Sequence, residues 1–260
     1  MDKDRNFDDL ADKFERKIYG GLKGDIRREV IWRDLCTTLP SVLGKSSLSI
    51  LDVGGGLGHL SVVLAQAGHQ VTYNDLSQAM GRKARGLAEK NGVEDKIQWY
   101  LCPYQELPLK HGQTFDLVLC HALMEWLVKP DLLLSQLARF LAPDGRISLT
   151  YYNENSLIYR NLIRGNFNVL QSQFHYDSGS LTPYNPMQPA QVTTWARESQ
   201  LAIESISGIR VFHDYVTSIR GGHESAQAVL EQELHYSRLE PFKWLGRYLH
   251  CILGWDSQPQ

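Results

Sequence analysis

The feature of this 260-residue sequence that most constrains its fold is a glycine loop directly after a short apolar run. Residues 48–53 (LSILDV) form the run, residues 52–58 (DVGGGLG) contain the loop, and residues 59–67 return to helical spacing. A short apolar run that ends in a glycine cluster is typical of a buried parallel strand. Glycine allows a tight turn and has no Cβ to keep a ligand at a distance. The loop therefore predicts a nucleotide-type cofactor site at the carboxyl end of a strand.

The spacing of the glycines distinguishes two kinds of nucleotide site. The dinucleotide fingerprint G-x-G-x-x-G is absent, because the position three residues after Gly56 is His59. The pattern present, D-x-G-x-G-x-G, resembles the first motif of class I methyltransferases, which bind S-adenosylmethionine (SAM). Asp75 stands 21 residues after Gly54, at the end of the next expected strand. A carboxylate there can accept hydrogen bonds from both ribose hydroxyls. Alternatively Asp75 caps the following helix, a role that is open to Ser77 as well.

Strand and helix patterns alternate between residues 48 and 152, which predicts an α/β fold with a doubly wound, mostly parallel sheet. The expected strands are 48–53, 70–73, 97–102, 115–120 and 146–152, and the expected helices are 5–40 with a break at 20–21, 59–67, 77–91 and 131–141, the last ending at the turn 143–145. The chain is completed by a helix and then a strand over 191–215, a helix over 224–239 and a strand in the tail HCILGW.

We expect one methyltransferase domain over residues 1–260. Within it, residues 1–40 form an N-terminal helical lid and residues 48–152 the SAM-binding core. Residues 153–190 carry Gly, Asn, Ser and three prolines, and predict an inserted substrate-facing lobe or a long loop. Residues 191–260 complete the sheet.

Composition and cysteine spacing exclude several classes of protein. The net charge of −2 excludes strong attraction of the whole molecule to nucleic acid, while a local basic face remains open. Cys36, Cys102, Cys120 and Cys251 share no zinc-type spacing, so we expect neither a metal site nor a disulfide framework. The opening residues lack a signal-peptide pattern, and no apolar stretch is long enough to span a membrane. We expect a cytoplasmic protein, monomeric or weakly dimeric.

Short segments spread over the whole chain carry a closer resemblance. They are 5–9 (RNFDD), 18–20 (IYG), 23–24 (KG), Arg27, 52–56 (DVGGG), 68–70 (GHQ), 121–123 (HAL), 125–126 (EW), 152–153 (YN), 165–167 (GNF), 210–215 (RVFHDY), 240–241 (EP) and 245–250 (LGRYLH). These segments are similar to those of the tRNA 5-carboxymethoxyuridine methyltransferases. The resemblance implies methylation of the carboxylate of 5-carboxymethoxyuridine at the wobble position, giving the methyl ester, with a tRNA anticodon stem-loop as partner.

The resemblance also implies the residues that contact SAM. They are Arg27, Gly54, Gly55, Asp75, Tyr104, Gln105 and His121. Arg27 would hold the methionine carboxylate through a bidentate, charge-assisted pair, while Tyr104 and Gln105 would flank the adenine. From the residues alone, Arg27 could instead be a solvated charge on a helix surface, and His121 could be a core histidine whose hydrogen bonds are satisfied.

A carboxylate acceptor determines the kind of mechanism to expect. It is ionised at neutral pH and therefore already nucleophilic, so direct in-line displacement needs no general base, and catalysis comes from positioning and desolvation. We find no constellation of side chains typical of a general base. The acceptor carboxylate needs cations or hydrogen-bond donors, and the candidates are Tyr152, Asn153, Arg210 and His213. Each could instead have an ordinary packing role.

RNA binding needs local cations and aromatic stacking platforms. Residues 13–33 contain seven basic and three acidic residues, and residues 155–176 contain Arg160, Arg164 and several aromatics but no acid. These stretches are the predicted anticodon-loop surface, although two amphipathic helices with solvated basic edges would have the same composition. Two other functions remain open: a small-molecule methyltransferase of the quinone or phenol type, and a SAM-binding protein without turnover.

Overall fold

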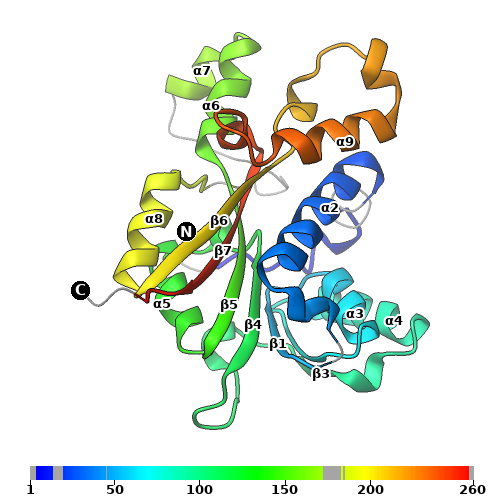
Figure 1. The fold of residues 1–260 in the computed structure, drawn as a ribbon, viewed down its shortest axis with the longest axis vertical. Coiled ribbons are helices and arrows are strands. Elements are labelled where there is room, and N and C mark those ends of the chain that lie inside the picture. Colours follow the sequence, from blue (N-terminus) through cyan, green and yellow to red (C-terminus); the bar gives the residue numbers. More distant parts are fainter. Residues whose placement is uncertain (1–3, 14–19, 45, 172–182, 184, 258–260) are drawn as a thin grey trace.

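The computed structural model describes residues 4–13, 20–44, 46–171, 183 and 185–257 (Figure 1). Its centre is a seven-stranded sheet in the order β3-β2-β1-β4-β5-β7-β6. The strands are β1 (Ser49–Val53), β2 (Gln70–Asn74), β3 (Ile97–Tyr100), β4 (Phe115–His121), β5 (Leu141–Tyr152), β6 (Leu201–Ile209) and β7 (Tyr248–Trp255). The first five are parallel, and β7 runs antiparallel to β5 and β6. The prediction of a doubly wound, mostly parallel sheet is confirmed.

Helices cover both faces of the sheet, because its central strands are apolar on both sides. The helices are α2 (Gly21–Thr38), α3 (His59–Gln66), α4 (Gln78–Lys90), α5 (Leu133–Ala138), α6 (Glu154–Ile163), α7 (Phe167–Gln171), α8 (Pro189–Glu198) and α9 (Ala226–Tyr236). Residues of α2, α3, α4 and α9 pack with Ile50 and Leu117 on one face. Residues of α5 and α8 pack with Leu51 and Val118 on the other. Among the described residues, no helix is both long and apolar enough to cross a membrane.

Two stretches of secondary structure differ from the sequence prediction. Residues 4–10 are irregular instead of helical, because the Phe7 ring packs edge-on against Trp126, with centroids 4.9 Å apart. Residues 14–19 of that expected helix lie outside the described residues. The turn expected at 143–145 lies inside β5, where the pairing shifts from Phe115–Leu141 to Leu117–Arg146.

The stretch after β5 is helical in its first half, where a long loop was one alternative. Asn153 caps α6: its side-chain oxygen accepts from the Asn155 N–H at 3.1 Å. Its amide nitrogen donates to the carbonyls of Trp244 and Gly246, both at 2.8 Å. These bonds join the start of α6 to the segment that enters β7. Helices α6 and α7 therefore stand beyond the carboxyl end of β5, as Figure 1 shows.

Candidate active site

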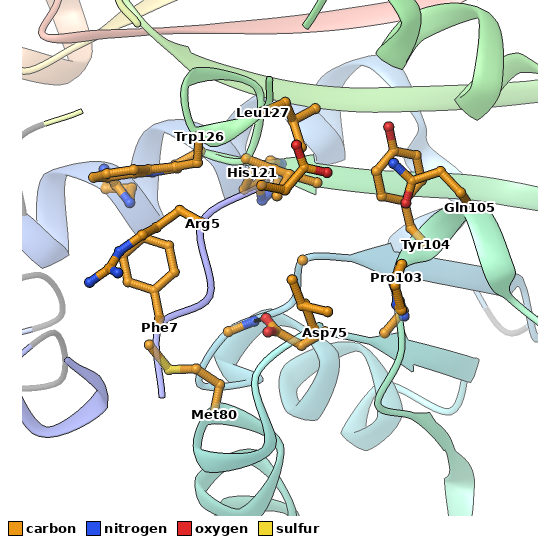
Figure 2. A pocket seen from close by; sticks show the side chains of 18 residues that line it. Arg5, Phe7, Asp75, Met80, Pro103, Tyr104, Gln105, His121, Trp126 and Leu127 are labelled. Atoms are coloured by element: carbon orange, nitrogen blue, oxygen red, sulfur yellow. Dashed lines mark hydrogen bonds between the residues drawn. The ribbon is translucent and has the colours of Figure 1, made fainter. Parts of the chain in front are cut away.

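A cleft opens at the carboxyl ends of β1, β2 and β4 (Figure 2), with about 850 Å³ of space including its open mouth. Its lining comprises Asp4, Arg5, Phe7, Arg27, Gly54, Gly56, Asn74, Asp75, Leu76, Met80, Pro103, Tyr104, Gln105, His121, Ala122, Leu123, Trp126 and Leu127. All the residues predicted to contact SAM are in this list except Gly55. Parallel α/β sheets bind ligands at this edge, where the order of the strands reverses.

The glycine loop enters the cleft through two residues with left-handed backbone. Gly54 has φ +67° and Gly56 has φ +55°, conformations that side chains rarely adopt. A Cβ at Gly54 would lie 3.3 Å from the Leu123 side chain. At Gly55 the reason for glycine is packing, because a Cβ there would lie 2.6 Å from the ring of Tyr73. Contact between Gly55 and the cofactor stays a prediction.

The Asp75 carboxylate is held firmly against the glycine loop. One oxygen accepts from the Gly56 N–H at 2.8 Å, and the other accepts from the Ser77 N–H at 2.7 Å. The first turn of α4 is capped by Ser77, whose hydroxyl accepts from the Met80 N–H at 3.1 Å. Burial raises the pKa of Asp75 to about 6. Each oxygen keeps a lone pair, so the carboxylate can still accept from two ribose hydroxyls.

Arg27 is a buried cation that faces the cleft. Only 8% of its surface is exposed, and its guanidinium lies 4.4 Å from the centre of the Tyr248 ring. The alternative of a solvated helix charge is therefore wrong. Among the described residues, Arg27 forms no ion pair. A carboxylate brought into the cleft by a ligand would supply the missing counter-charge.

Sequence reasoning missed the part of the cleft wall made by the N-terminal segment. The Asp4 carboxylate accepts from the Val128 N–H at 2.8 Å, and the Arg5 N–H donates to the Trp126 carbonyl at 3.3 Å. With the Phe7 ring against Trp126, these contacts place residues 4–7 across one side of the cleft. The segment was predicted to belong to a helical lid, and its place in the segment 5–9, which carried the family resemblance, was the available signal.

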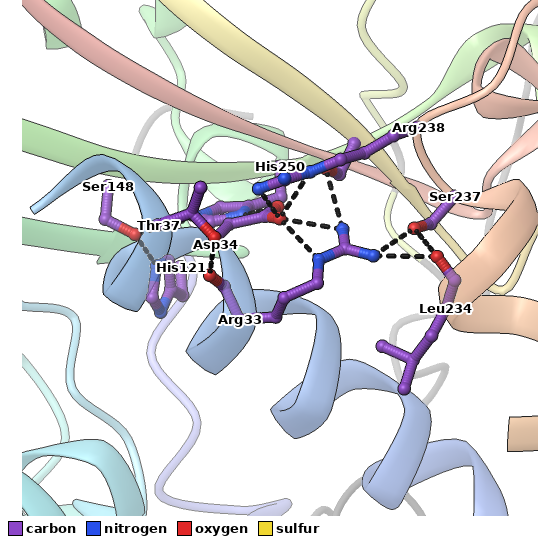
Figure 3. A network of polar contacts seen from close by, with 10 residues as sticks. Arg33, Asp34, Thr37, His121, Ser148, Leu234, Ser237, Arg238 and His250 are labelled. Carbon is purple, nitrogen blue, oxygen red and sulfur yellow. Dashed lines mark hydrogen bonds and ion pairs between the residues drawn. The ribbon is translucent and has the colours of Figure 1, made fainter. Parts of the chain in front are cut away.

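His121 lines the cleft and also ends a buried polar chain (Figure 3). Its Nε2 lies 2.8 Å from the Ser148 hydroxyl, which lies 2.8 Å from Nε2 of His250. Nδ1 of His250 lies 2.8 Å from the Asp34 carboxylate. Burial lowers the pKa of His121 well below its usual value, with smaller effects from His250 and Arg27, so its imidazole is neutral. The alternative of a satisfied core histidine therefore describes this residue, while its contact with the cofactor stays a prediction.

Asp34 is the fixed anion at the other end of that chain. One of its oxygens accepts from Arg33 at 2.7 Å and from Arg238 at 2.6 Å. Burial opposes ionisation, but the hydrogen bond and charge of His250 and the charge of Arg33 outweigh it, so the pKa of Asp34 lies well below its usual value. Arg33 was predicted to belong to an RNA-binding face. The structure instead places it in this network, with further bonds to Leu234 and Ser237.

Glu125 is a buried carboxylate that sequence reasoning did not select as a site residue. It is fully buried, and neither carboxylate oxygen has a hydrogen bond of ordinary geometry among the described residues. Burial raises its pKa to about 7, although the nearby backbone N–H groups of Glu125 and Tyr152 and the charge of Arg27 act in the opposite direction. Its place in the segment 125–126, which carried the family resemblance, was the available signal.

The residues predicted to meet the acceptor lie on the side of the sheet where β5 ends and β7 begins. The buried Tyr152 ring lies 4.9 Å from the guanidinium of Arg247, and the Arg210 guanidinium lies 5.6 Å from the Tyr248 ring. Arg164 donates to the Asp214 carbonyl at 3.2 Å. Arg247, Tyr248 and Asp214 were not predicted as site residues, although all three stand in segments that carry the family resemblance.

Two of the acceptor candidates have structural partners. The polar atoms of the Asn153 side chain are all engaged by the backbone contacts at the start of α6. His213 is half-buried, and its backbone N–H donates to Glu233 at 2.8 Å. Burial lowers the pKa of the His213 imidazole, with the charge of Asp214 opposing this. A role for either side chain in acceptor binding stays a prediction.

The sheet order, the glycine loop and the acid after β2 together define a Rossmann-like class I methyltransferase. Residues 51–149 match the family described as "Methyltransferase domain". A tRNA 5-carboxymethoxyuridine methyltransferase of Escherichia coli (strain K12) is 40% identical over 248 residues, 95% of each chain. This chain belongs to the family of tRNA 5-carboxymethoxyuridine methyltransferases, and the resemblance seen in the sequence is confirmed.

Two further relatives match a smaller part of this chain. A ubiquinone biosynthesis O-methyltransferase of Coxiella burnetii (strain RSA 331 / Henzerling II) is 31% identical over 163 residues, which cover 62% of this chain and 66% of the relative. The solved structure of magnesium protoporphyrin IX methyltransferase from Synechocystis PCC 6803 with bound SAH has a TM-score of 0.57 at 18% identity. It covers 77% of this chain and 88% of its own. A likeness at this identity establishes the fold alone.

Proposed function

We propose that this protein transfers the methyl group of SAM to the carboxylate of 5-carboxymethoxyuridine at the wobble position of tRNA. The observation that carries the proposal is the 40% identity to a tRNA 5-carboxymethoxyuridine methyltransferase over 95% of both chains. That match extends beyond the part of the fold shared with the ubiquinone-pathway relative, which covers 62% of this chain. It therefore favours the tRNA substrate over a quinone or phenol.

The cleft residues suit SAM by their charges and hydrogen-bonding groups. The buried Arg27 guanidinium suits the methionine carboxylate, and the Asp75 carboxylate suits the ribose hydroxyls. Gly54 and Gly56 let the cofactor approach the backbone, while Tyr104 and Gln105, beside the apolar side chains of the wall, suit the adenine. His121 faces the same cleft, and its anchoring by Ser148 holds the imidazole in one orientation.

The mechanism that follows is an in-line displacement with no general base. When bound, SAM would supply an electrophilic methyl on its sulfonium, and sulfur would leave with the electron pair of the carbon–sulfur bond as the carboxylate oxygen bonds to that carbon. The acceptor carboxylate is ionised near neutral pH and donates its own electron pair. The protein contributes by excluding water, by orienting the two reactants and by holding the acceptor anion with cations.

The remaining parts of the chain have proposed roles in the same reaction. Residues 1–40 act as a lid on the cleft, and residues 153–190 as a lobe that meets the anticodon loop. The exposed rings of Tyr159 and Phe167 support the second role as stacking platforms for bases; Phe174 and Tyr176 lie outside the described residues. A cytoplasmic location, the absence of a metal and a monomeric or weakly dimeric state remain predictions.

Methyl transfer from labelled SAM to tRNA from cells that lack the protein tests this proposal directly. We expect label in the methyl ester of the wobble nucleoside, detected by mass spectrometry. We also expect salt-dependent tRNA binding, weakened by charge reversal at Arg160 and Arg164 without loss of SAM affinity. Label in a quinone precursor with none in tRNA would favour the small-molecule function, and no transfer to any acceptor would favour a SAM-binding protein without turnover.

A further inference from the structure

Two arginines from distant parts of the chain lie over the rings of Tyr152 and Tyr248. The pKa of a third, Arg160, is lowered by burial and by the charge of Arg247, which lies close enough to act on it. Arg160 comes from α6, Arg210 follows β6, and Arg247 precedes β7. We call them the arginine cluster. The side chains of Arg210 and Arg247 are each only 13% exposed. Their guanidinium groups lie over the two tyrosine rings, whose centroids are 5.6 Å apart.

Charge within the arginine cluster is poorly balanced by the described residues. Asp214 is the carboxylate in contact with Arg210 and Arg247, at 3.5 and 3.7 Å, and it also contacts Lys23 at 3.3 Å. The first two distances are too long for hydrogen bonds. Burial lowers the pKa of Arg210, and the negative charge of Asp214 partly offsets this effect. One carboxylate thus faces several cations in a setting where an uncompensated charge is costly.

Some hydrogen-bond donors of the arginine cluster also lack a partner among the described residues. Nε of Arg160, Nε of Arg210 and Nη1 of Arg247 are buried and have no partner among the described residues. The backbone at this point is unusual as well: Arg210 has φ +60°, and its carbonyl accepts from the Arg247 N–H at 3.3 Å. Left-handed backbone at a residue other than glycine occurs preferentially at binding and catalytic sites. Unused donors and excess positive charge together indicate a place for an oxyanion.

The arginine cluster lies next to the cofactor cleft. Tyr152 and Tyr248 face each other in the antiparallel pairing of β5 and β7. The Tyr248 ring is shared by two guanidinium groups, that of Arg27 at 4.4 Å and that of Arg210 at 5.6 Å. Arg27 itself lines the cleft. An anion held by Arg210 and Arg247 would therefore lie close to the place where a methyl group would be transferred.

We propose that Arg210 and Arg247 form the subsite that recognises the ionised carboxylate of the acceptor and discriminates against its methyl ester. This inference rests on the proposed function. The planar guanidinium groups suit a flat carboxylate in bidentate geometry. Methylation removes the negative charge, so the neutral ester leaves the cluster uncompensated again and is bound more weakly. The same cations would also attract a phosphate of the anticodon backbone, which is the other source of an oxyanion.

Arg247→Met tests the subsite, because methionine keeps an apolar side chain over Tyr152 while removing the charge. The matched control is Arg139→Met, at an exposed position just after α5. Binding is measured with two tRNAs that differ only in the wobble base, one carrying the carboxylate and the other the methyl ester. We expect the wild type and Arg139→Met to prefer the carboxylate form by about ten- to a hundred-fold, the effect of a charge-assisted hydrogen bond. We expect Arg247→Met to bind the two forms almost equally, with unchanged SAM affinity.

The outcomes separate the two oxyanions. Equal weakening of both tRNAs in Arg247→Met would assign the arginine to a phosphate and overturn the inference, as would unchanged discrimination. If Arg247→Met does not fold, Arg247→Lys is used instead. Lysine keeps the charge but lacks the planar guanidinium, so the preference for the carboxylate tRNA over the ester tRNA should be reduced. A preference as large as that of the wild type would overturn the inference. Failure of the proposed function has a different signature, because the wild type would then transfer no label to tRNA. The free nucleoside and its ester, as ligands in thermal-shift measurements, test discrimination without turnover.

Discussion

Removal of the Arg27 guanidinium isolates one contact of the proposed cofactor site. The side chain is buried, rests on the Tyr248 ring at 4.4 Å and has no ion pair among the described residues, so its donors are available to a ligand. A hydrogen bond to a charged group contributes about 1.5–3 kcal/mol. Arg27→Ala should therefore weaken SAM binding by about ten- to a hundred-fold. Arg27→Lys should restore only part of this affinity, because lysine lacks the planar fork.

Isothermal titration calorimetry with SAM measures this effect directly. Arg28→Ala is the matched control, since Arg28 is the next residue of α2, its side chain is 47% exposed, and it pairs with Asp25 on the surface. The control should bind SAM as the wild type does, because a surface ion pair contributes little. Thermal unfolding of each variant shows whether the fold survives. Normal SAM affinity in a folded Arg27→Ala protein would refute both the assignment of the methionine carboxylate and the proposed lid role of the N-terminal residues.

Three further perturbations test the cleft and its support. Gly54→Val places a β-branched residue at φ +67°, with its Cβ 3.3 Å from Leu123, so SAM binding should be lost in a folded protein; calorimetry showing unchanged affinity would contradict the motif assignment. Asp34→Asn should lower the free energy of unfolding by about 3 kcal/mol at pH 7. Because the pKa of Asp34 is depressed in the folded state, its contribution is fully present above pH ~4 and declines progressively as the pH falls from there towards the folded-state pKa. Urea unfolding should therefore show the difference from wild type narrowing towards pH 3, and a constant difference would be inconsistent with this. Methylation at saturating SAM should not slow between pH 8 and 6, because the acceptor carboxylate stays ionised. Glu125, with a pKa of about 7, titrates in this window, and its protonation removes a negative charge. The rate should hold or rise as pH falls, and Glu125→Gln should flatten the profile. A fall that persists in Glu125→Gln would point to a general base or a phenol acceptor.

Local chemistry along the chain determined the core of the fold and half of the site. A short strand with apolar residues on both faces is stable only where both faces are covered, so this pattern indicates a buried parallel strand. The five parallel strands could therefore be predicted from the sequence. Gly54 and Gly56 could be predicted as turn residues for a similar reason, because glycine adopts left-handed backbone more readily than other residues. Asp75 followed from its place at the end of the second strand. Each of these signals spans only a few residues.

Only the tertiary structure decided what the charged residues do. In the sequence Arg27, Arg28 and Arg33 look alike, yet one faces the cleft, one lies on the surface and one joins the Asp34 network. The packing of Phe7 against Trp126 overrode a helical pattern, and the arginine cluster joins residues that stand 37 to 87 positions apart. Burial and long-range contact determine how strongly a charge interacts, and neither quantity is encoded in local periodicity.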